Sequence, residues 1–113
     1  MIEDTIVAML DSAGITNYPL VPPHDAPTPC VVYQKISMMD MRSHEGYVAE
    51  RGRWQFSCYA YTYPESKDLA ETVKALFDLN QIDFELATRE GEIDTPDPDT
   101  GLFRKILDFF IWK

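Results

Sequence analysis

The tripeptide Asp99-Thr100-Gly101 is the motif most suggestive of chemistry, because aspartic proteases carry the same three residues. In those enzymes two such loops meet so that their carboxylates share one proton. Here Pro98 directly precedes the tripeptide, and no hydrophobic strand leads into it. A turn with Gly101 at positive φ accounts for the same residues. We therefore interpret the segment as the entry to the last strand.

Metal binding is the second chemistry to consider. Five carboxylates lie between residues 88 and 101: Glu90, Glu92, Asp94, Asp97 and Asp99. They lack the alternating oxygen ligands, the central glycine and the distal glutamate of an EF-hand loop, so only weak cation binding stays open. His24 and His44 each stand alone in the sequence, without metal-ligand spacing from Cys30 or Cys58. We expect no metal site.

Motifs for nucleophilic catalysis and for phosphate binding are absent from the sequence. No serine lies in a Gly-x-Ser-x-Gly elbow, and no glycine-rich loop joins a strand to a helix. The polar residues are not concentrated around any reacting centre. The sequence therefore predicts a protein that packs and assembles, rather than an enzyme, and one without a cofactor.

Length and charge set the broad class. With 113 residues the chain is long enough for a single domain, 1–113, and too short for two ordinary ones. The formal net charge of −9 argues against a surface that grips DNA or RNA, since such surfaces need clustered Lys and Arg. Acidity suits a solvated exterior, a basic protein partner, or a wall along which a polyanion slides.

Cysteine usage and the termini indicate a reduced compartment. The first residues resemble no signal peptide, and no segment approaches the ~20 apolar residues of a membrane span. We therefore expect a cytosolic chain without a membrane partner. Cys30 and Cys58 then act as small hydrophobic residues on strands, without a disulfide.

Two amphipathic helices are predicted from apolar residues that recur every three or four positions. The first covers residues 2–13 and is closed by Gly14. The second covers residues 63–80, with Thr62 as its N-cap and Glu65 completing a capping box.

Alternating apolar and polar residues predict four strands, at 30–37, 51–62, 82–86 and 102–112. The last strand carries bulky apolar groups on both sides, which favours a central position or burial against another subunit. Residues 17–29 contain five prolines and are expected to form an extended strap that starts the sheet. Residues 88–101 are expected to form an acidic connection.

A long hairpin arm is predicted over residues 37–52, with a polar tip that contains Gly46. Its methionines either fill the core of their own subunit or dock on a neighbouring protein. The candidate contact residues are Met38, Met39, Met41, Arg42 and Tyr47 on the arm, with Phe110 and Trp112 on the last strand. The fold class is α+β, with two helices on a mainly antiparallel sheet of four to five strands in the order α-β-β-α-β-β.

Six short motifs follow one another along nearly the whole chain. They are YPLV at 18–21, AP at 26–27, PCVVYQKIS at 29–37, QFSCYA at 55–60, DPDTGLFR at 97–104 and LDFFIW at 107–112. In this order they resemble the tail-completion proteins of long-tailed bacteriophages, also called tail terminator or head-tail joining proteins. No single motif is specific, and the order of several moderate motifs carries the resemblance.

The resemblance implies an α+β virion subunit that assembles in the host cytoplasm as a homo-oligomeric ring, usually of six copies. Such a ring sits at the head-proximal end of the tail tube and ends tail growth. It joins the tail to the head connector protein, and DNA passes through its lumen without specific binding. The alternative is an acidic, monomeric adaptor or inhibitor that binds a basic host protein in a one-to-one complex.

Overall fold

The computed structural model describes residues 2–21, 28–43, 46–80, 84, 86–96 and 101–113, and within 38–43 and 46–50 it describes the backbone alone. The elements in chain order are α1 (Ile2–Ser12), β1 (Asn17–Pro19), β2 (Cys30–Ser43), β3 (Gly46–Ala60), α2 (Tyr63–Phe77), β4 (Leu86–Pro96) and β5 (Phe103–Trp112). This architecture confirms the predicted α+β class and adds one short strand, β1, to the predicted order.

The five strands form one sheet in the order β1-β2-β3-β5-β4. Only the short pair β1–β2 is parallel, and the other neighbours are antiparallel. Phe56 of β3 pairs with Tyr33 of β2 on one side and with Leu107 of β5 on the other. Because β5 lies between β3 and β4, its predicted central position is confirmed.

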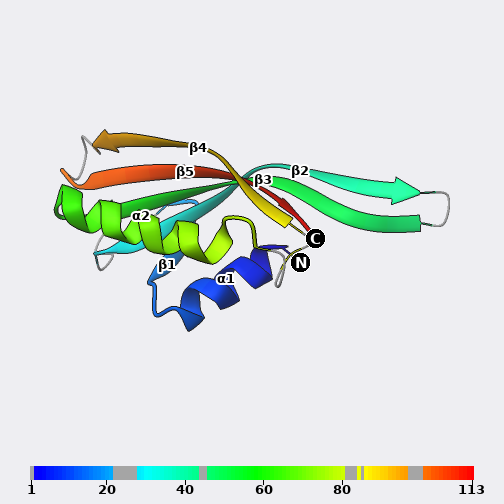
Figure 1. The fold of residues 1–113 in the computed structure, drawn as a ribbon, viewed down its shortest axis with the longest axis horizontal. Helices are drawn as coiled ribbons and strands as arrows, with labels where there is room; N and C mark the ends of the chain where they lie inside the picture. Colours follow the sequence, from blue (N-terminus) through cyan, green and yellow to red (C-terminus); the bar gives the residue numbers. More distant parts are fainter. Residues whose placement is uncertain (1, 22–27, 44–45, 81–83, 85, 97–100) are drawn as a thin grey trace.

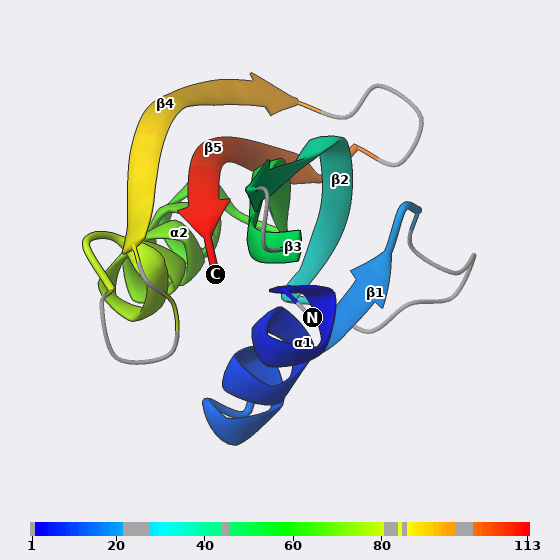
Figure 2. The same ribbon diagram turned by 90° about the vertical axis from the view of Figure 1, so that its right-hand side faces the viewer.

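Both helices lie on the same side of the sheet, as Figures 1 and 2 show from two directions. We call this the helix side, and the opposite side, which no described helix covers, the open side. Trp54, Phe56, Cys58 and Ala60 point to the helix side and are at most 1% exposed, as the alternation in β3 predicted. Alternation along β3 therefore separates a filled core from the open side.

Aromatic rings form the centre of the core on the helix side. Phe56 stacks on Phe77 of α2 with 4.8 Å between ring centroids, and it meets the edge of Phe109 of β5 at 5.7 Å. Ile6 and Leu10 of α1 are fully buried in the same cluster. The amphipathic stripes of both helices thus close on the sheet, as expected for helices with one apolar face.

The predicted hairpin arm is present as the far ends of β2 and β3. The two strands pair from Met38 opposite Gly52 to Ser43 opposite Gly46. In Figure 1 this ribbon extends well beyond the helices, and both chain termini lie near its base, far from its tip. The molecule measures 51 × 23 × 23 Å, so it is about twice as long as it is wide.

The N-cap of α2 and the glycines after α1 and before β5 have the geometry that the sequence predicts. The hydroxyl of Thr62 accepts a hydrogen bond from the backbone N–H of Glu65 at 3.3 Å, and it donates to the Glu65 carboxylate at 3.2 Å. Gly14 after α1 and Gly101 before β5 have φ of +73° and +72°, a region in which glycine avoids the steric penalty of a Cβ atom. The predicted positive φ of Gly101 is confirmed, while the rest of the predicted turn, with Asp99, lies outside the described residues.

Two predicted elements differ in the structure. The prediction of an acidic connection at 88–101 is wrong. Strand β4 occupies Leu86–Pro96 and pairs along its length with β5. The predicted strand at 82–86 lies largely outside the described residues, and Phe84 within it is buried but is not part of a strand. Helix α2 ends at Phe77 rather than at residue 80, because Asp78 and Leu79 leave helical geometry.

Candidate interaction surfaces

The five predicted contact residues of the arm lie on the paired strands that project from the sheet. Met38, Met39, Met41 and Arg42 belong to β2, and Tyr47 belongs to β3. Their side chains lie outside the described part of the structure. Their contact role therefore stays a prediction, which rests on their position in the arm.

Phe110 and Trp112 lie on the open side, because they alternate with the buried residues Phe109 and Ile111 along β5. Both rings are half-buried, and their centroids are 6.1 Å apart. The guanidinium carbon of Arg51 lies 5.2 Å from the centroid of Phe110 and 5.5 Å from that of Trp112. These distances are those of a cation–π contact with two rings at once.

Arg53 lies on the same surface as Arg51, two residues further along β3, where it pairs in register with Phe110. Its guanidinium lies 3.2 Å from the carboxylate of Asp108 on β5, and the two side chains are 44% and 17% exposed. Gln55 donates to the other oxygen of the same carboxylate at 3.4 Å. Polar contacts between β3 and β5 therefore occupy Asp108, while the Arg53 side chain stays partly exposed to water.

A small apolar cluster fills the other end of the open side. Cys30, Val32 and Tyr59 are buried there, and Tyr18 packs against them. Arg104 of β5 lies above the Tyr59 ring, with 5.9 Å between its guanidinium carbon and the ring centroid. This cluster is closed within the monomer, in contrast to the surface around Arg51.

Sequence reasoning identified Phe110 and Trp112 but missed the two arginines beside them. The alternation in 51–62 did put Arg53 on the polar side of β3. It did not reveal which strand lies beside that side, because the pairing of Arg51 with Trp112 joins residues 61 positions apart. Only the register of β3 and β5 brings the arginines and the aromatic rings together.

Ion pairs join α2 to the edge strand β4. The ammonium of Lys74 lies 2.7 Å from the Glu92 carboxylate and 2.9 Å from that of Glu71. The hydrogen bond from Lys74 lowers the pKa of Glu92, and the same kind of bond lowers the pKa of Glu71. The two carboxylates in turn raise the pKa of Lys74. All three groups are therefore charged at neutral pH.

Lys105 and Tyr63 make a second connection to β4. The Lys105 ammonium lies 3.5 Å from the carboxylate of Asp94, and the hydroxyl of Tyr63 donates to Asp94 at 3.3 Å. A pocket of about 190 Å³ lies beside them, between the start of α2 and the strands β4 and β5. Phe103 lines it and meets the edge of the Tyr63 ring at 6.3 Å. Since Asp94 is already paired, the pocket is mainly an apolar feature.

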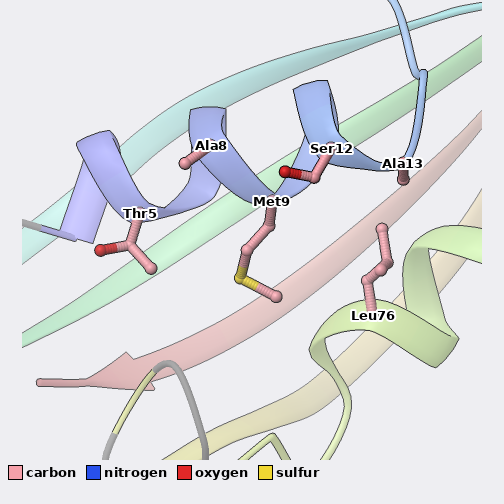
Figure 3. A pocket seen from close by; sticks show the side chains of 6 residues that line it. All are labelled: Thr5, Ala8, Met9, Ser12, Ala13 and Leu76. Carbon is pink, nitrogen blue, oxygen red and sulfur yellow. The ribbon is translucent and has the colours of Figure 1, made fainter.

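A second described pocket, of about 390 Å³, is a groove between α1 and α2. Figure 3 shows Met9 of α1 and Leu76 of α2 facing each other across it. Its lining is Thr5, Ala8, Met9, Ser12, Ala13 and Leu76. None of these side chains is an acid or a base at neutral pH. The groove thus offers no general acid–base pair and no set of metal ligands.

The two cysteines lie on opposite sides of the sheet. Cys30 pairs in register with Tyr59, and Cys58 pairs with Val31, so their side chains point away from each other across neighbouring strands. Both thiols are free and buried, as the sequence predicted. Burial raises the pKa of the Cys58 thiol to about 12, so it stays protonated and is a poor nucleophile.

No other clear chemical site is present among the described residues. Within them, no three His, Cys, Asp or Glu side chains gather as metal ligands would. None of the described helices has the length and apolar character needed to cross a membrane. The surface around Arg51, Phe110 and Trp112 is therefore the main candidate for function.

Neither the models of known protein families nor the curated proteins yield a match to this chain. The resemblance to tail-completion proteins thus stays a prediction from the order of the sequence motifs.

Proposed function

We propose that this chain is a structural tail-completion protein of a phage or prophage. Copies of it form a ring at the head-proximal end of the tail tube, end tail growth and join the tail to the head connector. The order of the sequence motifs along nearly the whole chain supports the assignment. The second support is the distribution of apolar side chains between the two sides of the sheet.

The observation that carries the proposal is an aromatic surface that the monomer buries only in part. The core on the helix side is complete with Phe109 and Ile111 at 0% exposure, whereas Phe110 and Trp112 lie on the open side. Protein interfaces are enriched in aromatic residues and arginine and depleted in other charged residues. A surface with this composition suits contact with another subunit.

The arm and the charge suit the same role. A two-stranded ribbon that extends beyond the helices at one end of the molecule suits contact with a neighbouring subunit. A chain with a net charge of −9 gives a ring whose lumen repels DNA, so that DNA passes through without sticking. The six copies, the tail tube and the head connector come from the resemblance.

Electron microscopy of the purified protein tests the proposal, both alone at high concentration and mixed with tail tubes. Rings with a central opening, free or capping one end of the tubes, are the expected result. A free subunit that is monomeric does not contradict the proposal, because the ring can form when subunits bind the tube. The mixture with tail tubes is therefore the decisive sample. A monomer that does not bind tail tubes and forms a one-to-one complex with a basic host protein would favour the adaptor alternative.

A further inference from the structure

We propose that the open side of the sheet at the base of the arm is the docking surface for the acidic flank of a second copy. The arginine–aromatic surface consists of Arg51, Arg53, Phe110 and Trp112. The acidic flank consists of Glu65, Asp68, Glu71, Glu92 and Asp94 on α2 and β4. This inference rests on the proposed ring and specifies which surfaces of its subunits meet.

The arginine–aromatic surface has the composition of an interface centre. Tryptophan and arginine are the residues whose truncation most often weakens protein–protein binding strongly. Arg51 lies 5.2 Å and 5.5 Å from the ring centroids of Phe110 and Trp112, so the rings restrict its guanidinium before any partner arrives. A restricted side chain loses less conformational entropy on binding.

Among the side chains that the structure describes, no carboxylate engages the N–H donors of Arg51, whereas Arg53 is paired with Asp108. Arginine presents its donors in a planar fork that fits a carboxylate with two parallel hydrogen bonds. The partner of this surface therefore carries carboxylates beside an apolar patch.

The sheet separates charge between its two sides. Among the side chains that the structure describes, the open side carries Arg51, Arg53 and Arg104 against Asp108 and Glu90, which lies at the β4 edge and is bonded to the Thr88 hydroxyl. This is a positive excess on a chain whose total charge is −9.

The acidic flank supplies the complementary charge. Its cations are Lys67, Lys74, Arg89 and the buried Lys105, and the last three are already paired with Glu71, Glu92 and Asp94. Glu65 and Asp68 at the start of α2 are exposed, and no described cation forms an ion pair with either. These two carboxylates are therefore the natural partners for the arginines of a neighbouring copy.

The two surfaces face different directions within one subunit, so the contact is head-to-tail. Each copy uses its arginine–aromatic surface toward one neighbour and its acidic flank toward the other. Contacts of this kind form a closed ring when the rotation between subunits closes. Nucleic acid is the other anion that suits stacked arginine and aromatic groups, and its binding is an outcome of the test below.

Charge-reversed variants test the contact by complementation. The surface variant is Arg51→Glu with Arg53→Gln, and the flank variant is Glu65→Lys with Asp68→Lys. We expect each alone to raise the protein concentration needed for ring assembly by about tenfold or more. We expect an equimolar mixture to recover rings, because each mixed contact then joins opposite charges. Light scattering with electron microscopy provides the readout, and circular dichroism confirms folding.

A matched control changes charge away from both surfaces. Lys35→Glu with Lys113→Gln alters net charge as the surface variant does, and both lysines lie off the open side. Control assembly should equal that of the wild type. If the wild type forms rings and both reversed variants form them equally well, this inference is overturned and the proposed function stands.

Binding of a labelled DNA oligonucleotide, followed by fluorescence anisotropy, supplies the remaining comparison. Loss of DNA binding by the surface variant, with unchanged ring assembly, would assign the surface to nucleic acid and overturn the subunit contact. A wild type that forms no ring, even with tail tubes, would instead remove the proposed function itself.

Discussion

The ammonium of Lys74 on α2 lies 2.7 Å from the carboxylate of Glu92 on β4. This contact joins the second helix to β4, the strand at one edge of the described sheet. The Lys74 side chain is only 13% exposed, whereas that of Glu92 is 37% exposed. The pair is therefore partly shielded on one side and open to water on the other.

Replacing Glu92 with Gln tests what this pair contributes. We expect the free energy of unfolding at pH 7 to fall by at most about 1 kcal/mol, because Glu92 remains well solvated. The lowered pKa of Glu92 means that its contribution is present above the ordinary carboxylate pKa and is lost as pH falls through the lowered value. Because the pKa of Lys74 is raised, the contribution of the pair to the free energy of unfolding is lost at alkaline pH only above the ordinary lysine pKa.

Urea denaturation at several pH values measures this effect. The difference between wild type and Glu92→Gln should be largest near neutral pH and should shrink toward both extremes. Asp68→Asn is a suitable control, since the exposed Asp68 carboxylate lies on the same flank without a described ion pair. A Glu92 difference that grows on acidification would contradict the assignment.

Phe109 and Phe110 are adjacent residues with opposite roles. Phe109 is fully buried against Phe56 and Phe77, so Phe109→Ala should reduce the free energy of unfolding by about 3–5 kcal/mol. Phe110→Ala removes a partly buried ring from the open side and should cost about 1 kcal/mol. Chemical denaturation of both variants measures the two losses.

The variant that loses less stability should lose more ring assembly. At temperatures where both variants are folded, we expect Phe110→Ala to impair assembly and Phe109→Ala to leave it near the wild-type level. Equal losses of stability in the two variants would show that the two sides of β5 are equally buried. That result would remove the reason for treating the open side as an interface.

Local patterns predicted the elements whose stability comes from nearby residues. Thr62 and Glu65 marked the start of α2, and the alternation of Trp54 with its neighbours gave the buried side of β3. In both cases the signal lies within a few residues of the position it determines. At these positions the local preference and the tertiary packing favour the same structure, so the prediction from sequence is correct.

Strand β4 shows why the rest of the fold was missed. Its sequence, LATREGEIDTP, is rich in acidic residues and contains Gly91 and Pro96, which favour a loop. It becomes a strand because β5 offers a complete ladder of hydrogen-bonding groups, and because Lys74 and Lys105 pair with its helix-side carboxylates. Neither cause is visible without the tertiary arrangement. The surface around Arg51 was missed for the same reason, because it depends on a cross-strand register.

The arm methionines provide a separate test of assembly. Replacing Met38, Met39 and Met41 together with Ser should impair the joining of the protein to tail tubes while leaving the thermal unfolding midpoint nearly unchanged. The physical reason is position: Met38 and Met39 lie opposite Gly52 and Arg51 at the base of the ribbon, and Met41 lies opposite Ala49, past the last pair between β3 and β5. Methionine is flexible and polarizable, which suits adaptable contacts with another protein.

Met9→Ser is a useful comparison for the arm variant. Met9 packs against the core from α1, so its replacement should lower the unfolding midpoint without a specific loss of joining. An unfolded arm variant, or an arm variant that joins tubes normally, would contradict the proposed contact role.

Salt concentration should control ring formation, because every copy carries a net charge of −9. At 0.01 M salt the screening length is about 30 Å, so the subunits of a ring repel one another strongly. At 0.15 M it falls to about 8 Å, which removes most of this long-range repulsion, while partly buried contacts such as those proposed for Arg51 are screened much less.

We therefore expect the ring fraction, measured by light scattering, to rise between these two salt concentrations. A variant with Glu3→Gln and Asp11→Asn carries two fewer charges on α1, away from both proposed surfaces, and should assemble at lower salt than the wild type. The repulsion that it relieves acts between whole subunits rather than at one contact, so its effect should disappear once salt screens the wild type fully. Rings that strengthen on dilution into low salt would instead indicate that attraction between opposite charges dominates assembly.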